Sequence, residues 1–136
     1  MDKETWAAAE KFGLDVANAA ERIKVVDVDV FHANRSDHRK KGIAIPMKYY
    51  LRMPKILANP KAVYYDKAKN SLLYEFYPKI TDPEKGKMAG VFVVKVGDYT
   101  TDDGSRKRRK AMSKVRTALL TPKSALSNKG RYVKIK

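Results

Sequence analysis

The sequence predicts an α+β domain in which N-terminal helices pack on an antiparallel sheet of four to five strands. Near the N-terminus, apolar residues recur at the spacing of one helix face. In the second half of the chain, short runs of aromatic and β-branched residues are separated by turn signals, which is the pattern of successive strands. Helices followed by strands are typical of domains whose helices lie on one face of an antiparallel sheet.

Length and composition fit one folded domain. The chain has 136 residues, 43% of them hydrophobic, so it can bury a core, and this composition excludes a wholly disordered protein. We therefore expect a single domain over 1–136, with a helical and extended lead over 1–29 and the core over 30–136. The chain has no cysteine, which excludes disulfides and thiolate metal sites, and we expect neither a metal nor a cofactor.

The first helical segment is expected over Lys3–Ile23, with Trp6 and Phe12 packing on the domain. Gly13 weakens the middle of this segment, so it forms either one kinked helix or two short helices. The next residues, Lys24–Val30, contain valines that alternate in part with aspartates and suit a short strand or an extended arm.

A polar segment separates this lead from the next helix. Phe31–Gly42 contains both histidines and is expected to be a loop or a helix end. Pro46 is expected at the start of a helix, where its missing N–H costs nothing. Pro54 and Pro60 should confine that helix to about two turns.

The strands are expected in the second half. Ala62–Lys67 and Ser71–Tyr77 should form an antiparallel hairpin. Gly90–Val96 is the most apolar candidate and is expected at the centre of the sheet. Val115–Thr121 is a fourth candidate strand and Arg131–Ile135 a fifth. The polar segments expected to be loops are Thr81–Lys87 and Asp98–Lys110.

The charge balance points to a polyanionic partner. Thirty Lys and Arg against fifteen Asp and Glu give a formal net charge of +15, and phosphate backbones are the usual partners of such proteins. An anionic membrane surface, another polyanion, or a basic protein without a binding role are the alternatives. The longest apolar run, Met88–Val94, is far too short to span a membrane, and Met1–Ala20 lacks the apolar stretch of a signal peptide.

The two histidines are candidates for proton transfer. Cleavage of RNA without a metal needs a base, an acid and cations at the phosphate, and the pKa of histidine suits the first two roles. His38 directly precedes Arg39, Lys40 and Lys41, so we expect it to act as acid or base and the three cations to bind RNA. The alternative is a surface histidine. His32 is a second candidate, although its position after Phe31 favours packing beside the strand over a catalytic role.

Lys95 interrupts an apolar strand. Strand alternation places Lys95 on one face with Val91 and Val93, and Phe92, Val94 and Val96 on the other. If the face of Lys95 meets substrate, this lysine is a phosphate ligand in a cleft.

The segment 113–117 should also alternate. Ser113, Val115 and Thr117 are expected on one face, and Lys114 and Arg116 on the other. Arg116 offers a bidentate fork to a phosphate and Thr117 a neutral donor. The pattern leaves open which of the two faces meets the substrate.

A run of five basic residues, Arg106–Lys110, follows the expected central strand. It is either a solvated loop or an arm that tracks the RNA backbone. The residues that we expect to bind RNA in this run are Arg106, Lys107, Arg108, Arg109 and Lys110.

The order of these features resembles the phage-encoded nuclease domains of the barnase, EndoU, colicin and RelE superfamily, found in phage head-morphogenesis proteins and polymorphic toxins. The segments that carry the resemblance, from about Val30 to Ile135, are SDHRKKG, YYLRMPKILANP, AVYYD, LLYEFYP, VFVVKV and VRTALLT. It implies an antiparallel sheet on N-terminal helices and metal-independent RNA cleavage on that sheet. It places the family's histidine at His38, its strand lysine at Lys95 and its polar strand residue at Thr117, with Arg116 beside it.

The sequence thus predicts a metal-independent endoribonuclease that leaves a 2′,3′-cyclic phosphate, a toxin or phage-associated effector with RNA as partner and a cytoplasmic site of action. The resemblance implies delivery by a phage particle or a toxin system, and with the charge it implies an acidic immunity or antitoxin protein as second partner. Two alternatives stay open: a non-catalytic RNA- or DNA-binding module, and a phage structural component that contacts the genome.

Overall fold

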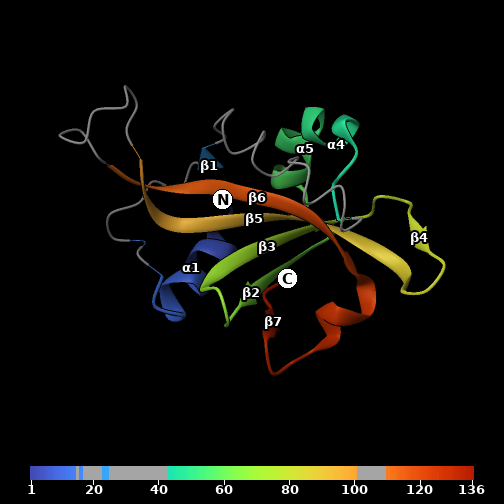
Figure 1. Cartoon of the computed structure of the whole chain (residues 1–136). Helices are drawn as coiled ribbons and strands as arrows, with labels where there is room; N and C mark the ends of the chain where they lie inside the picture. Colours follow the sequence, from blue (N-terminus) through green and yellow to red (C-terminus); the bar gives the residue numbers. More distant parts are fainter. Residues whose placement is uncertain (15, 17–22, 25–42, 101–109) are drawn as a thin grey trace.

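Among the residues that the structure describes, which are 1–14, 16, 23–24, 43–100 and 110–136, seven strands form one sheet in this computed structural model (Figure 1). Their order is β1-β6-β5-β3-β2-β7, and β4 pairs with β5 beside this path. Neighbouring strands are antiparallel except for β1, which runs parallel to β6. The strands are β1 (Ile23–Lys24), β2 (Ala62–Asp66), β3 (Ser71–Phe76), β4 (Thr81–Asp82), β5 (Gly86–Thr100), β6 (Lys110–Pro122) and β7 (Tyr132–Lys134).

The predicted α+β class is confirmed, with more strands in the described sheet than the four to five expected. The five expected strands correspond to β2, β3, β5, β6 and β7. β1 overlaps the expected short strand or extended arm Lys24–Val30 at Lys24 alone, because 25–30 lie outside the described residues. β4 has two residues, too few to show an alternating pattern in the sequence. β5 and β6 also extend into the expected loop Asp98–Lys110, of which residues 101–109 lie outside the described residues.

The first helix, α1 (Lys3–Lys11), is shorter than expected. Asp2 caps its N-terminus by accepting a hydrogen bond from the Thr5 backbone N–H at 2.8 Å. Just past the end of α1, Gly13 adopts a φ of 79°, a left-handed conformation that glycine adopts more readily than residues with a Cβ. The prediction that helical structure extends to Ile23 is wrong. Ile23 lies in β1, where it pairs with Ser113 of β6.

The residues that anchor α1 also differ from expectation. Thr5 and Ala9 are buried, whereas Trp6 is only partly buried. Phe12 does pack on the domain as expected, because its ring stacks on that of Tyr65 in β2, with centroids 4.4 Å apart. No helix in the described part of the chain is long and apolar enough to cross a membrane.

Two short helices, α4 (Met47–Leu51) and α5 (Met53–Ala58), follow Pro46. Pro54 lies in the first turn of α5, where proline is tolerated, so it does not end the helix as expected. Tyr49 and Tyr50 of α4 are buried, and the Tyr49 hydroxyl donates to the Pro78 carbonyl at 2.8 Å.

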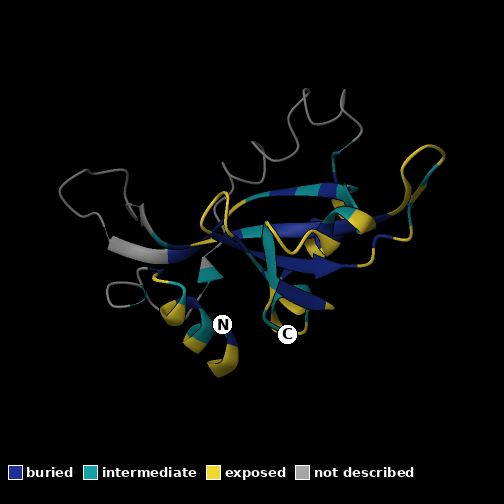
Figure 2. Cartoon of the chain, turned by 90° about the horizontal axis from the view of Figure 1, so that it is seen from below, coloured by how far each residue is buried: buried dark blue, intermediate teal, exposed yellow. Residues whose placement is uncertain are grey.

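These helices and α1 lie on one face of the sheet, which we call the covered face. Its main hydrophobic cluster joins Ala9 of α1, Tyr50 of α4 and Met53 of α5 to alternate residues of four strands. The strand residues of this cluster are Val63, Tyr65, Leu72, Tyr74, Phe76, Met88, Phe92, Val94, Val96, Val115, Ala118 and Leu120. Figure 2 shows the central strands buried over most of their length, whereas the helices have exposed outer surfaces.

Aromatic rings fill the centre of the covered face. Phe92 is completely buried and its ring stacks on Phe76 at 5.1 Å between centroids. Tyr49 and Tyr50 reach these two rings from α4, at 4.9 and 6.2 Å. Gly90 leaves room for this packing, because a Cβ there would lie only 2.3 Å from the Phe76 ring.

The opposite face, which we call the open face, is covered only in part. A 3₁₀ helix, η2 (Lys123–Ser127), follows β6, and its Leu126 is buried in a second hydrophobic cluster. Strand residues of this cluster include Ala62, Tyr64, Leu73, Ala89 and Val91. The remainder of the open face is hollowed into a pocket.

Candidate nucleic-acid interface on the open sheet face

The pocket on the open face has a volume of about 500 Å³. Among its described lining residues, four Lys or Arg side chains against a single carboxylate leave a formal charge of +3. The lining residues are Asp66, Lys69, Ser71, Leu73, Val91, Val93, Lys95, Arg116, Thr117, Leu119, Thr121, Arg131 and Tyr132. A basic pocket of this kind is suited to an anionic ligand.

The register of the strands separates an apolar floor from a polar end. Leu73 of β3 pairs with Val93 of β5, which pairs in turn with Thr117 of β6. One row further along, the pairing of Leu72 with Val94 places Ser71 next to Lys95. The pocket therefore offers a ligand both an apolar surface and a row of polar groups.

The expected alternation around Lys95 agrees with the structure. Phe92, Val94 and Val96 are buried in the core of the covered face, whereas Val91, Val93 and Lys95 line the pocket. The lysine is exposed on the open side of the central strand β5. Lys95 therefore lies on the open face, next to the pocket.

The expected alternation over 113–117 places Val115 and Arg116 on opposite faces correctly but is wrong for Thr117, because β6 contains a β-bulge. Val94 pairs with Val115 and Val93 with Thr117, so Arg116 is an extra residue between the two pairs. Val115 is buried in the core of the covered face, whereas Arg116 and Thr117 both line the pocket. A bulge changes the direction of the side chains that follow it, and here it brings a cation and a hydroxyl to one site.

Two hydroxyl groups in the pocket lack a hydrogen-bond partner. They are the buried Oγ of Ser71 and Oγ1 of Thr117. A buried hydroxyl without a partner costs free energy, and a polar ligand in the pocket would remove that cost.

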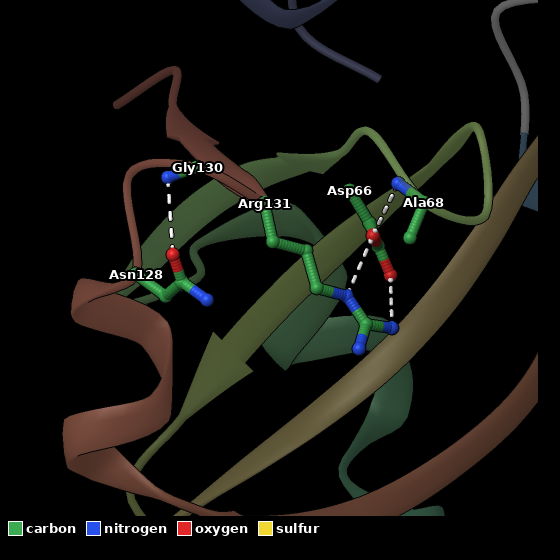
Figure 3. Close-up of polar contacts among 5 residues, drawn as sticks. All are labelled: Asp66, Ala68, Asn128, Gly130 and Arg131. Carbon is green, nitrogen blue, oxygen red and sulfur yellow. Dashed lines mark hydrogen bonds and ion pairs between the residues drawn. The ribbon is translucent and has the colours of Figure 1, made fainter.

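An ion pair forms one wall of the pocket. Asp66, at the end of β2, is buried and accepts two hydrogen bonds from Arg131, at 3.0 Å from Nε and 3.1 Å from Nη2 (Figure 3). The Ala68 backbone N–H donates to the same carboxylate at 3.0 Å. The hydrogen bond to Asp66 raises the pKa of Arg131 above its usual value. The arginine is charged in any case, and the two hydrogen bonds fix its guanidinium in place.

The turn before β7 positions Arg131. Asn128 Oδ1 accepts a hydrogen bond from the Gly130 N–H at 3.1 Å, and the Arg131 N–H donates to the Asn128 carbonyl at 3.1 Å. The Arg131 guanidinium also lies 5.1 Å from the centre of the Tyr132 ring, within the range of a cation–π contact.

A second buried carboxylate on the open face holds η2. Glu75 of β3 is 1% exposed and accepts a hydrogen bond of 2.5 Å from Nζ of Lys123, the first residue of η2. Burial, together with the charge of Glu75, raises the pKa of the nearby Tyr64. The segment from η2 to β7 is thus tied to the sheet by a buried carboxylate at each end.

The structure brings together three of the predicted catalytic residues, Lys95, Arg116 and Thr117. Both predicted histidines, His32 and His38, lie outside the described residues, as do the RNA-binding candidates Arg39, Lys40, Lys41, Arg106, Lys107, Arg108 and Arg109. Lys110 is the first residue of β6, but its side chain is outside the described part.

Asp66, Ser71 and Arg131 were not expected at the site. Asp66 and Arg131 are 65 residues apart and meet because β2 pairs with β7 at the sheet edge. The only signal in the sequence was an acid at the end of one expected strand and a cation at the start of another. Without the strand order, that signal does not show that the two side chains meet.

Comparisons with protein-family models, with curated proteins and with solved structures gave no match. The resemblance to the nuclease superfamily stays a prediction from the sequence. A function for this chain has to be based on the chemistry of its pocket.

Proposed function

We propose that this chain is a metal-independent endoribonuclease that binds the RNA backbone in the pocket of the open face. The observation that carries the proposal is the bulge in β6, which places Arg116 and Thr117 together in a pocket that Lys95 also lines. Two cations and a hydroxyl are suited to a phosphate whose negative charge increases during cleavage. The net charge of +15 would attract RNA to this site.

The reaction is a transfer of the phosphoryl group within the RNA. A base removes the proton of the 2′-hydroxyl, the 2′-oxygen attacks phosphorus, and the bond to the 5′-oxygen breaks as an acid protonates that oxygen. Lys95 and Arg116 stabilise the pentacoordinate phosphorus and Thr117 donates to one of its oxygens. We assign proton transfer to His38, with His32 as the alternative, on the sequence alone.

A non-catalytic RNA- or DNA-binding module is the second candidate. One observation favours it: among the described lining residues, the single carboxylate, Asp66, is already bonded to Arg131. The described lining residues therefore offer cations that can bind an anion, but no unpaired carboxylate that could act as a base.

The two candidates separate in one experiment. We expect the purified chain to cleave end-labelled RNA in EDTA, and His38→Ala to lower the rate about 100-fold with nearly unchanged affinity, as for loss of a general acid or base. Lys129→Gln removes a charge outside the pocket and is the matched control for Lys95→Gln and Arg116→Gln. Binding without cleavage would support the module, and full activity of His38→Ala would refute the histidine assignment.

Salt dependence tests the role of the two cations. The logarithm of the RNA binding constant should fall with the logarithm of salt concentration by about 0.7 for each phosphate contact to a single strand. Lys95→Gln and Arg116→Gln should each reduce this slope by about 0.7, and Lys129→Gln should not. Equal slopes for the wild type and the three variants would show that Lys95 and Arg116 do not contact phosphate.

The same charge would attract an acidic protein. We propose an acidic immunity or antitoxin protein that covers the pocket in the producing cell, since a field that steers RNA also steers a protein inhibitor. Expression of the chain without a partner in a bacterial cytoplasm should arrest growth with loss of RNA, and His38→Ala should relieve the arrest. Healthy cells with intact RNA would contradict the toxin proposal.

A further inference from the structure

The wall of the pocket formed by Asp66 and Arg131 differs chemically from the wall formed by Lys95 and Arg116. Nε and Nη2 of Arg131 are bonded to the Asp66 carboxylate, so this ion pair has no net charge. In Figure 3 the third guanidinium nitrogen points away from the carboxylate. That nitrogen and the outer N–H of Nη2 remain as two parallel donors in a planar fork.

The Arg131 donors are held in place before a ligand arrives. Asp66 is 3% exposed and is itself fixed by the Ala68 N–H, while the Tyr132 ring lies beneath the guanidinium. A fork restrained from two sides loses little conformational entropy when it binds. Arg131 is therefore suited to recognise a planar group with two acceptors.

Ser71 adds an independent sign that a polar ligand belongs here. Ser71 is 3% exposed and lines the pocket, and its Oγ has no hydrogen-bond partner. It pairs with Asp66 across the hairpin and lies next to Lys95 on the other side. The hydroxyl thus lies between the neutral ion pair and the cations proposed to hold phosphate.

We infer that Asp66, Arg131 and Ser71 form a subsite for one unpaired nucleobase, adjacent to the phosphate-binding cations. The inference rests on the proposed binding of RNA. A phosphate needs a net positive charge, to which Lys95 and Arg116 contribute, whereas a neutral base edge matches the neutral ion pair. The apolar floor of Leu73, Val93 and Leu119 would lie under the base or its ribose.

The donor pattern selects among the bases. Two parallel N–H donors match a base edge with two adjacent acceptors, which guanine presents at O6 and N7. Adenine presents one acceptor and one donor on the same edge, so it would place its amino group against a guanidinium donor. The subsite should therefore prefer guanine to adenine.

The test uses RNA that cannot be cleaved. Three fluorescent 2′-O-methyl decamers are compared by anisotropy in EDTA: all uridine, one internal guanosine, or one internal adenosine. The wild-type chain should bind the guanosine decamer about 10-fold more tightly than the adenosine decamer, which is within the usual discrimination of a bidentate contact. Equal affinity for all three would overturn the inference and leave the binding of RNA intact.

Variants assign the preference to the subsite. Arg131→Gln should bring the guanosine-to-adenosine ratio close to one, while its affinity for all-uridine RNA should fall no more than that of Lys129→Gln, which loses the same charge outside this pocket. Because Arg131→Gln leaves Asp66 buried without its cation, Ser71→Ala serves as a second variant in which the ion pair stays intact. Ser71→Ala should lower the ratio about 3-fold.

Two results would overturn the inference in different ways. If Arg131→Gln weakens all three decamers equally and keeps the ratio, Arg131 contacts phosphate and no base subsite exists there. If the wild-type chain binds none of the decamers at low salt, the proposed RNA binding fails, and the base subsite fails with it.

Discussion

The two faces of the sheet use neighbouring residues of the same strands for different purposes. On the covered face, Phe92 and Val94 pack among aromatic rings from α4 and side chains from α1. On the open face, Val93 and Lys95 line a pocket, and both buried carboxylates of the described residues, Asp66 and Glu75, belong to this face. The covered face thus stabilises the fold, whereas the buried charged groups of the open face lower the free energy of unfolding.

Unsatisfied polar groups alone do not distinguish the two faces. Buried hydroxyls without a partner occur on the covered side, at Ser113 and Tyr74, as well as on the open side, at Ser71 and Thr117. The difference is their surroundings, because Ser71 and Thr117 line a pocket together with Lys95, Arg116 and Arg131. This teaches that a candidate site is marked by buried polar groups, charge and space for a ligand together.

The largest effect is expected from the covered face. Phe92→Ala should lower the free energy of unfolding by about 3–5 kcal/mol, because it removes a fully buried ring and leaves a cavity. Val93→Ala, the next residue but on the open face, should cost only about 1 kcal/mol and should weaken RNA binding instead. Urea unfolding and RNA titration measure the two quantities. Equal destabilisation by both variants would contradict the division between the faces.

A smaller effect should separate the hydroxyls of the two faces. Thr117→Val and Ser113→Ala each remove a buried hydroxyl that lacks a partner, so each should raise the free energy of unfolding by about 1 kcal/mol. Only Thr117→Val should reduce RNA affinity and cleavage, because Ser113 lies on the covered side of β6. If Ser113→Ala impairs RNA binding as much as Thr117→Val, the hydroxyl of Thr117 has no specific role.

The smallest effect on the free energy of unfolding is expected from Asp2, which caps the helix α1 on the covered face. Partial burial alone would raise the pKa of Asp2, but hydrogen bonds from Lys136 and from the Thr5 N–H outweigh it and lower the pKa to about 2. Asp2→Ala should reduce the free energy of unfolding at neutral pH by about 0.5–1 kcal/mol, without a change in RNA binding.

The pH dependence of this variant gives a second measurement. Because the folded pKa of Asp2 is below the ordinary value of 3.8, its ionised form stabilises the fold above about pH 4, and this contribution is lost as the pH falls to about 2. The difference in stability between wild type and Asp2→Ala should therefore shrink between pH 4 and pH 2. A constant difference over that range would show that the charge of Asp2 does not contribute.

Much of the fold could be predicted because its signals are local. The alternation of aromatic and apolar residues in Ala62–Asp66 and Ser71–Phe76 indicated the hairpin, and the apolar run around Phe92 indicated a central strand. The same alternation placed Lys95 opposite the core. The sequence alone also determined the charge of +15, and with it the expectation of a polyanionic partner.

The site depended on features that local patterns do not carry. Alternation has a strict period of two residues, so the extra residue Arg116 reversed the expected face of Thr117, and only the pairing of β5 with β6 shows the bulge. The contact of Asp66 with Arg131 depends on the pairing of β2 with β7, between residues 65 positions apart. Tertiary structure decided these features because the packing and pairing of distant strands determine which side chains share a pocket.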